Sequence, residues 1–328
     1  MNKALARILA CAALCCLAPQ WPLAQTNTEA EAISDEIFGP RQPIDEAFGA
    51  FQRGYYLTAL ALALPRAEKD DAAAQTLIAE IYGNGLGVAK NLPRAATWYD
   101  LADKNGNVQA TFQLAELYQN GTGVPKNRKK AAELFEKAAR GGSDEAKYNL
   151  ALLHVEGIYA APDLSRAAEL MREAAKANLP EAQYDFGTML MEGAGLPPDI
   201  KAGARYIRRA AQAGLTAAQV DYATLLYLGQ GVPQSLEKSI AWYTRAAEAG
   251  NPVAQNRLGK LYAAGEGVPL NLETAAMWRA LARRQGLNDK SLDALLISID
   301  AETLANAEER ARFWPSEPPS GSADTSKP

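Results

Sequence analysis

The stretch Leu215–Gly250, LTAAQVDYATLLYLGQGVPQSLEKSIAWYTRAAEAG, decides the fold, because the chain contains it six times in diverged form. The copies are 36 residues long, follow one another without a gap, and fill residues 71–286. They begin at Asp71, Asn107, Ser143, Leu179, Leu215 and Asn251. Self-similarity at a fixed period of this length is typical of stacked helical hairpins, in which one unit alone cannot bury its own apolar face.

Each copy carries the pattern of two helices with defined starts and stops. Alanine at place four and larger apolar residues at places eight and eleven share one face of the first helix, since spacings of four and three align side chains. Glycine at place fifteen favours a left-handed helix end, and it occurs as Gly85, Gly121, Gly157, Gly193, Gly229 and Gly265. The second helix is predicted to begin after a capping residue, namely Asn91, Asn127, Asp163, Asp199, Ser235 or Asn271.

The pattern Ala-x-x-x-Leu-x-x-Leu-Tyr-x-x-Gly-x-Gly-Val-Pro, followed by Ala-x-x-Trp-Tyr-x-x-Ala-Ala, resembles the Sel-1-like repeat (SLR). That repeat is a variant of the tetratricopeptide repeat with a slightly longer unit. The resemblance covers residues 71–286. It implies an all-α fold, a right-handed α-solenoid of stacked antiparallel helix pairs. It also implies an adaptor or scaffold for protein complexes, often in bacterial envelope or signalling systems.

Residues 1–24 are predicted to be a secretory signal peptide. Lys3 and Arg7 give a positive start, Ile8–Ala18 is apolar, and Ala24 offers a small residue for cleavage. The apolar run is shorter than the ~20 residues that a membrane span needs. We therefore expect cleavage after Ala24, a periplasmic or secreted protein, and no transmembrane span.

The segments outside the repeats are predicted to be a linker, two end caps and a tail. Residues 25–43 are polar and are expected to form the linker, and 44–70 are expected to form two short capping helices with a turn at Gly54. Residues 287–313 are predicted to form one C-terminal capping helix, and 314–328 a disordered tail. The C-terminal helix would begin after Asn288 or Asp289 and seal the last repeat with Leu292, Leu295, Leu296 and Ile299.

The composition narrows the possible chemistry. The 328 residues are 48% hydrophobic and carry a net charge of −4, which gives no basis for nucleic-acid binding. All three cysteines lie in the predicted signal peptide, at Cys11, Cys15 and Cys16, so the mature chain would have no disulfide or zinc–thiolate site. The single histidine, His154, occupies a place where three other units carry tyrosine, and we interpret it as structural. We expect no metal, no cofactor and no catalytic residue.

The first helices supply the candidate binding residues, on the side opposite their core face. Places six, ten and thirteen point that way, and in a solenoid this side is expected to line the concave wall. Aromatic and methionine residues are enriched at interface cores. The candidates are Phe112, Tyr148, Leu152, Val155, Tyr184, Met191 and Tyr227. The alternative is that the aromatic residue at place six packs on the adjacent repeat, and the sequence leaves both possibilities open.

The leading functional hypothesis is an exported protein–protein interaction module that binds a partner peptide or helix on the concave face. One alternative is a cell-envelope enzyme, since some cysteine-rich relatives have been assigned penicillin binding or β-lactam hydrolysis, although this sequence lacks their cysteine pairs. Another is a scaffold for envelope polysaccharide secretion. The leading hypothesis predicts a protein or peptide as the partner, with components of the cell envelope among the candidates.

Overall fold

The computed structural model describes residues 45–157 and 161–316, which form sixteen helices and no strand. The first helices of the six repeats are α5 (Ala72–Asn84), α7 (Val108–Asn120), α9 (Asp144–Glu156), α11 (Pro180–Glu192), α13 (Thr216–Leu228) and α15 (Pro252–Ala264). The second helices are α6 (Leu92–Lys104), α8 (Arg128–Arg140), α10 (Leu164–Lys176), α12 (Ile200–Gln212), α14 (Leu236–Glu248) and α16 (Leu272–Arg284). The remaining helices are α3 (Glu46–Gln52), α4 (Tyr56–Ala67), α17 (Lys290–Leu295) and α18 (Ala301–Phe313). The predicted signal peptide, the linker and the last twelve residues lie outside the described residues.

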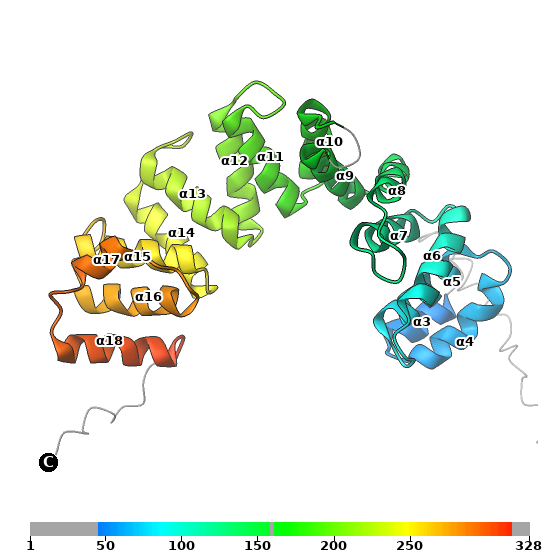
Figure 1. Ribbon diagram of the computed structural model, residues 1–328, viewed down its shortest axis with the longest axis horizontal. Helices are drawn as coiled ribbons and strands as arrows, with labels where there is room; N and C mark the ends of the chain where they lie inside the picture. The colour runs from blue at the N-terminus through cyan, green and yellow to red at the C-terminus, as the bar shows by residue number, and fades with distance from the viewer. Residues whose placement is uncertain (1–44, 158–160, 317–328) are drawn as a thin grey trace, which may run out of the picture. The chain divides into compact units, whose positions relative to one another are not determined.

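The six repeats are consecutive helix pairs, as Figure 1 shows. Each first helix packs against the second helix of its own unit, and that second helix packs against the first helix of the next unit. The side chains at place eight are buried in all six units, and they are Ile78, Leu114, Leu150, Phe186, Tyr222 and Leu258. The predicted all-α fold of stacked helix pairs is confirmed.

The described residues divide into two compact units, with the boundary between Ala59 and Leu60. In the first, Asp45 caps α3 by accepting a hydrogen bond from the backbone N–H of Phe48. The Phe51 ring lies stacked 6.4 Å from that of Phe48 and edge-on at 5.5 Å to that of Tyr56. Helix α4 crosses the boundary, and the second unit contains all six repeats.

The predicted helix starts and stops agree with the structure. In all six second helices the side chain before the first residue accepts a hydrogen bond from the backbone N–H three residues on. The glycines at place fifteen have φ between 64° and 75°, the region where a side chain costs free energy. Leu179 and Leu215 stand before α11 and α13 without a side-chain cap. These two helices therefore keep the glycine at their C-terminal end as their only cap.

A buried glutamine ties neighbouring units together. The amide Nε2 of Gln183, Gln219 and Gln255 donates to the backbone carbonyl eight residues earlier, at 3.3, 3.2 and 3.2 Å, and Gln75 does the same at 2.9 Å. Each acceptor lies at the end of the preceding helix, where carbonyls have no partner within that helix. The bond therefore fixes how one unit follows the next.

The second glycine of the Gly-x-Gly pair marks a close contact between units. A Cβ atom on Gly195 would lie 2.0 Å from the carbonyl oxygen of Leu164, the first residue of the preceding second helix. Gly123 and Gly231 approach the corresponding residues of their own preceding units, with Cβ distances of 2.6 Å to backbone atoms. The two glycines of the pair therefore have different roles. The first ends a helix, and the second lets the backbone of the preceding repeat pack closely.

The C-terminal cap differs from the prediction of one helix over 287–313. The structure has two helices, α17 and α18, because α17 ends at Leu295 and α18 begins after Asp300, whose side chain caps it. Leu292 is fully buried as expected, but Leu295 is 51% exposed and does not seal the repeat. Helix α18 packs on α16 and buries Ala307 and Ala311 there.

Candidate functional site

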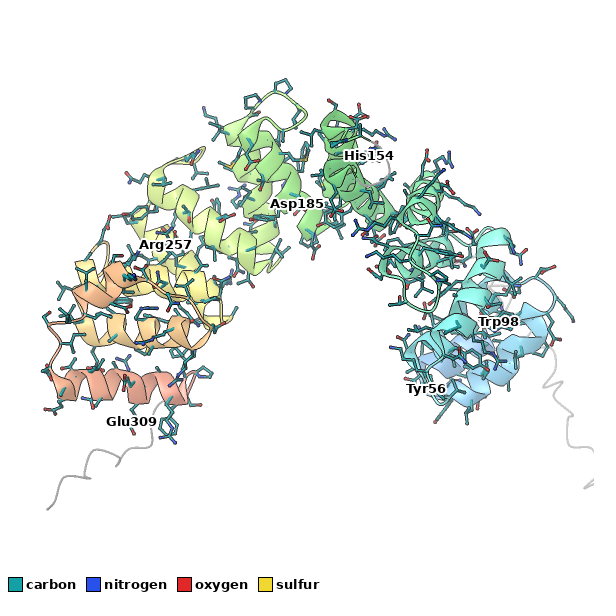
Figure 2. The ribbon with its side chains drawn as sticks, in the orientation of Figure 1. Tyr56, Trp98, His154, Asp185, Arg257 and Glu309 are labelled. Atoms are coloured by element: carbon teal, nitrogen blue, oxygen red, sulfur yellow. The ribbon has the colours of Figure 1, made fainter. Side chains whose placement is uncertain are left out.

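Two of the predicted binding residues, Tyr148 and Tyr184, hold neighbouring repeats together. The Tyr148 hydroxyl donates to the carboxylate of Asp185 at 3.0 Å, and the Tyr184 hydroxyl donates to that of Asp221 at 2.7 Å. Both bonds join place six of one unit to place seven of the next. Figure 2 labels Asp185, which lies on α11. These tyrosines are half-buried. Their hydroxyl groups contact the adjacent repeat, as in the alternative that the sequence left open.

The partly buried surroundings of the Tyr148–Asp185 bond also shift the pKa values of both groups. Burial, together with the neighbouring Asp185 carboxylate, raises the pKa of Tyr148. Burial also raises the pKa of Asp185, although the hydrogen bond from Tyr148 opposes that effect. A carboxylate whose pKa is raised by burial costs free energy when it ionises. The Tyr148–Asp185 pair is therefore a structural contact whose strength depends on pH.

Phe112 belongs to the core. It is 8% exposed, and its ring lies 5.7 Å from that of Phe135, which is fully buried on α8. This corrects the prediction that Phe112 faces a partner, because a side chain buried in this way offers no surface for one. Leu152 is half-buried and Val155 is exposed on α9, and neither belongs to the two pockets described next.

The two remaining candidates, Met191 and Tyr227, line adjoining pockets. The α11–α13 pocket has a volume of about 320 Å³ and is lined by Thr188, Met191, Glu192, Ile207, Asp221, Thr224, Leu225 and Gln230. The α13–α15 pocket has a volume of about 360 Å³ and is lined by Thr224, Tyr227, Leu228, Tyr243, Arg257, Lys260, Leu261, Ala264, Glu266, Ser291 and Leu295. Thr224 lines both, so the pockets meet on the first-helix face of the last three repeats.

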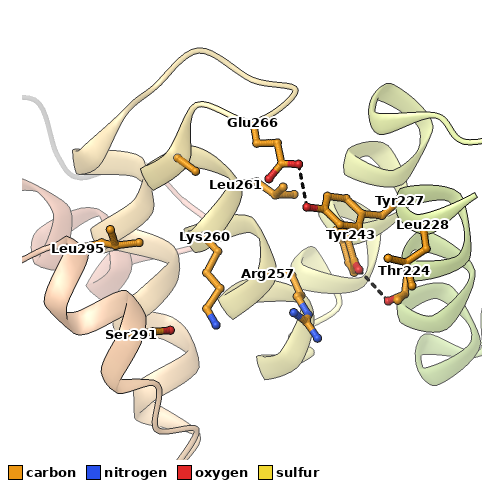
Figure 3. A pocket seen from close by; sticks show the side chains of 11 residues that line it. Thr224, Tyr227, Leu228, Tyr243, Arg257, Lys260, Leu261, Glu266, Ser291 and Leu295 are labelled. Carbon is orange, nitrogen blue, oxygen red and sulfur yellow. Dashed lines mark hydrogen bonds between the residues drawn. The ribbon is translucent and has the colours of Figure 1, made fainter.

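Hydrogen bonds order the tyrosine wall of the α13–α15 pocket (Figure 3). The Tyr243 and Thr224 hydroxyls lie 2.7 Å apart, and the Tyr227 hydroxyl donates to the carboxylate of Glu266 at 2.7 Å. The bond to Glu266 raises the pKa of Tyr227, and burial raises that of Tyr243. Both phenols stay protonated near neutral pH and present ring faces with fixed orientation.

Asp289 fixes the opposite wall of the α13–α15 pocket by joining α15 to α17. Its carboxylate accepts from Lys260 Nζ at 2.6 Å and from Asn256 Nδ2 at 2.7 Å, and it also caps α17 through the N–H groups of Ser291 and Leu292. Burial alone would raise the pKa of Asp289, but these hydrogen bonds hold it well below its usual value. The Lys260 charge is therefore balanced within the protein.

The sequence reasoning missed the charged residues of this pocket. Arg257 and Lys260 stand at places seven and ten of the last unit, and place ten lies on the helix face that supplied the predicted binding residues. That prediction considered only apolar and aromatic side chains, so neither charged residue was included. Leu295 was assigned to the end seal, and only the break between α17 and α18 explains its exposure.

Other sequence features have structural roles. Burial lowers the pKa of His154. Lys130 lies 4.5 Å from the Tyr118 ring centroid and donates to its hydroxyl. The spacing Ser-x-x-Lys of serine acyl enzymes occurs at Ser235–Lys238. There Ser235 caps α14 by accepting from the backbone N–H of Lys238, as the residues at the same place do in the other five repeats.

These features define a solenoid repeat protein with an open face built from first helices. The Sel1 repeat family model matches residues 72–107, 108–143, 144–179, 180–215, 216–251 and 252–287. The chain therefore belongs to the Sel1 repeat family. Sel1 repeat proteins generally mediate protein–protein interaction.

Solved structures support the fold. A Sel1 repeat protein from Oxalobacter formigenes is 28% identical, with a TM-score of 0.65, over 74% of this chain and 97% of that one. A protective antigen present in uropathogenic Escherichia coli strains, which displays an SLR fold, is 23% identical with a TM-score of 0.71. That match covers 89% of this chain and 64% of the antigen. A comparison with curated proteins found no match. Among the described residues, no helix combines the length and apolar character needed to cross a membrane.

Proposed function

We propose that this protein is an exported adaptor that binds a segment of a partner protein on its first-helix face, at the two adjoining pockets. The observation that carries the proposal is their shared residue Thr224, since it places the two pockets next to each other across α11, α13 and α15. Met191, Leu228 and Leu295 supply apolar contact area along that surface, with tyrosine rings beside them. Apolar and aromatic anchors in pockets provide most of the binding energy in typical interfaces.

Export rests on the predicted signal peptide. The test is to isolate the protein from the periplasm or the medium and to determine its first residue by mass spectrometry. We expect Gln25, because cleavage is predicted after Ala24. A protein that stays in the cytoplasm with residues 1–24 attached would contradict export without touching the binding proposal.

Binding is tested by site-specific photocrosslinking in cells. A photoreactive phenylalanine analogue replaces Leu228, which is 59% exposed and lines the α13–α15 pocket. The matched control places the same analogue at Val253, which is 41% exposed on α15 and outside both pockets. We expect a discrete crosslinked protein at Leu228 and none at Val253. Equal products at both positions, or none at Leu228, would refute the proposal.

A further inference from the structure

We propose that the α13–α15 pocket recognises an extended peptide segment in which a carboxylate lies next to a large apolar side chain. The inference rests on the proposed function, because it specifies the partner segment that the same face would bind. It follows from three properties of the pocket: one available cation, an apolar floor, and a fixed anion at the far end.

Arg257 is the available cation. Its side chain is exposed on α15, and it forms no hydrogen bond or ion pair with another residue of the described ranges. Lys260, one turn further along, already pairs with Asp289 at 2.6 Å. The planar guanidinium of arginine offers parallel N–H donors that match a carboxylate in bidentate geometry. A ligand carboxylate can therefore pair with Arg257 without breaking an ion pair within the protein.

The floor of the pocket is apolar and partly open. Leu261 is buried, while Leu228 and Leu295 are more than half exposed and lie on opposite sides of the pocket (Figure 3). Filling the space between these leucines with an apolar side chain would remove apolar surface from water on both partners, at roughly 25 cal/mol per Å². Charge pairing to Arg257 alone would be screened at this exposed position. Apolar burial beside the ion pair is what would make the contact selective.

Glu266 gives the pocket a direction. Its carboxylate is held by the Tyr227 hydroxyl, and Figure 3 shows the Arg257 and Lys260 side chains extending away from it. A ligand carboxylate would be repelled at the Glu266 end and attracted at the Arg257 end, so the acidic group can enter in one orientation only. A basic side chain next to the apolar anchor would face Arg257 and be rejected.

The size of the pocket favours an extended segment over a helix. Its volume of about 360 Å³ lies near the lower end of the ~300–1,000 Å³ typical of small-molecule sites. A whole helix with side chains is about 10–12 Å across. The space thus admits one or two side chains, while the peptide backbone continues across Thr224 toward the α11–α13 pocket.

The experiment is an NMR titration of the isotopically labelled chain with ten-residue Gly/Ser peptides. One peptide carries Leu-Glu at its centre, and the others carry Leu-Lys, Leu-Gln or Ser-Glu. We expect the Leu-Glu peptide to bind at least tenfold more tightly than the Leu-Lys and Ser-Glu peptides. The shifted resonances should come from α13, α15 and α17.

Two charge reversals separate the specific effect from the general one. Arg257→Glu should lose the preference for Leu-Glu and gain one for Leu-Lys, while Arg208→Glu, the same change at an exposed site on α12, should keep the wild-type order. Both sites are exposed, and circular dichroism confirms that each variant folds. Equal binding of Leu-Glu and Leu-Gln peptides, equal effects of the two reversals, or binding of none of the peptides would overturn the inference.

The outcome is distinguishable from failure of the proposed function. If a partner crosslinks at Leu228 but the peptides show no preference that depends on Arg257, the adaptor function is supported and the carboxylate recognition is refuted. An Arg257-dependent preference for Leu-Glu, with no partner crosslinked in cells, supports the recognition chemistry and removes the adaptor function.

Discussion

Replacing each glycine of one Gly-x-Gly pair by alanine tests whether the pair has two separate roles. Gly193 and Gly195 have nearly the same backbone conformation, with φ of 75° and 76°. Their surroundings differ: a Cβ on Gly193 would meet the Pro198 side chain at 3.3 Å, whereas one on Gly195 would lie 2.0 Å from the Leu164 carbonyl oxygen. The two variants therefore share the conformational cost, and only Gly195→Ala adds a collision with backbone.

The expected losses follow from these distances. An alanine held in the left-handed region costs about 1 kcal/mol relative to glycine, so Gly193→Ala should lower the free energy of unfolding by about that amount. Overpacking adds roughly 1–3 kcal/mol, and at Gly195 the obstacle is the backbone at the start of α10, which cannot rotate away. Gly195→Ala should therefore cost about 3 kcal/mol in total.

The assay is urea unfolding of the wild type and both variants, followed by circular dichroism at 222 nm. Because the Gly195 contact joins two repeats, its loss should also broaden the transition, as expected when coupling between units weakens. Equal losses in the two variants would refute the assignment of the second glycine to inter-repeat packing. A larger loss at Gly193 would reverse the two roles.

Three further variants test contacts between units by the same assay. Tyr184→Phe removes the 2.7 Å bond to Asp221 and should cost about 1–3 kcal/mol, as expected for a hydrogen bond to a charged group, with no loss if the bond is absent in solution. The pKa of Asp185 is raised in the folded state, so its contribution to the free energy of unfolding is full below its ordinary pKa of 3.8 and is lost as pH rises. The stability of Asp185→Asn relative to wild type should therefore increase between pH 4 and 7. A stability difference that stays constant over this range would contradict the argument. For Asp289, a lowered folded pKa means that its contribution is present above pH 3.8 and is lost as pH falls further. Asp289→Asn should lose stability at pH 7 and differ less from wild type at pH 2.

The local architecture of each repeat could be predicted because its signals lie within a few residues of the structure they produce. The caps at Asn91 and Asn127 bond to N–H groups three residues away, and Gly85 ends the helix that precedes it. The other five repeats end in glycine, and Asn178, which ends the third repeat, adopts the same left-handed conformation with φ of 68°. Six copies of each signal made the helix boundaries reliable.

The contacts between units could not be predicted in the same way, because they depend on the register between neighbouring helices. The Tyr148–Asp185 bond spans 37 residues, one more than the repeat period, and the tyrosine appears in the sequence only as an amphipathic side chain. The break at residues 296–300 was equally hidden. The apolar residues Leu292, Leu296 and Ile299 have helical spacing, yet the chain turns between α17 and α18.

The pocket forms where the repeat pattern ends, and this explains why a search for apolar side chains found only part of it. Columns shared by all six units build the framework, so differences between units must carry any individual function. At place seven, the fourth and fifth units have Asp185 and Asp221, which bond to the tyrosine of the preceding repeat, whereas the last unit has Arg257. Place six of the preceding unit is Val220 rather than tyrosine. No hydroxyl group from that unit can therefore bond to the side chain at place seven, which is Arg257. The paired change converts a structural contact into an available cation beside an apolar pocket. A column-by-column comparison that tracks both partners of each inter-repeat bond would have pointed to Arg257 from the sequence.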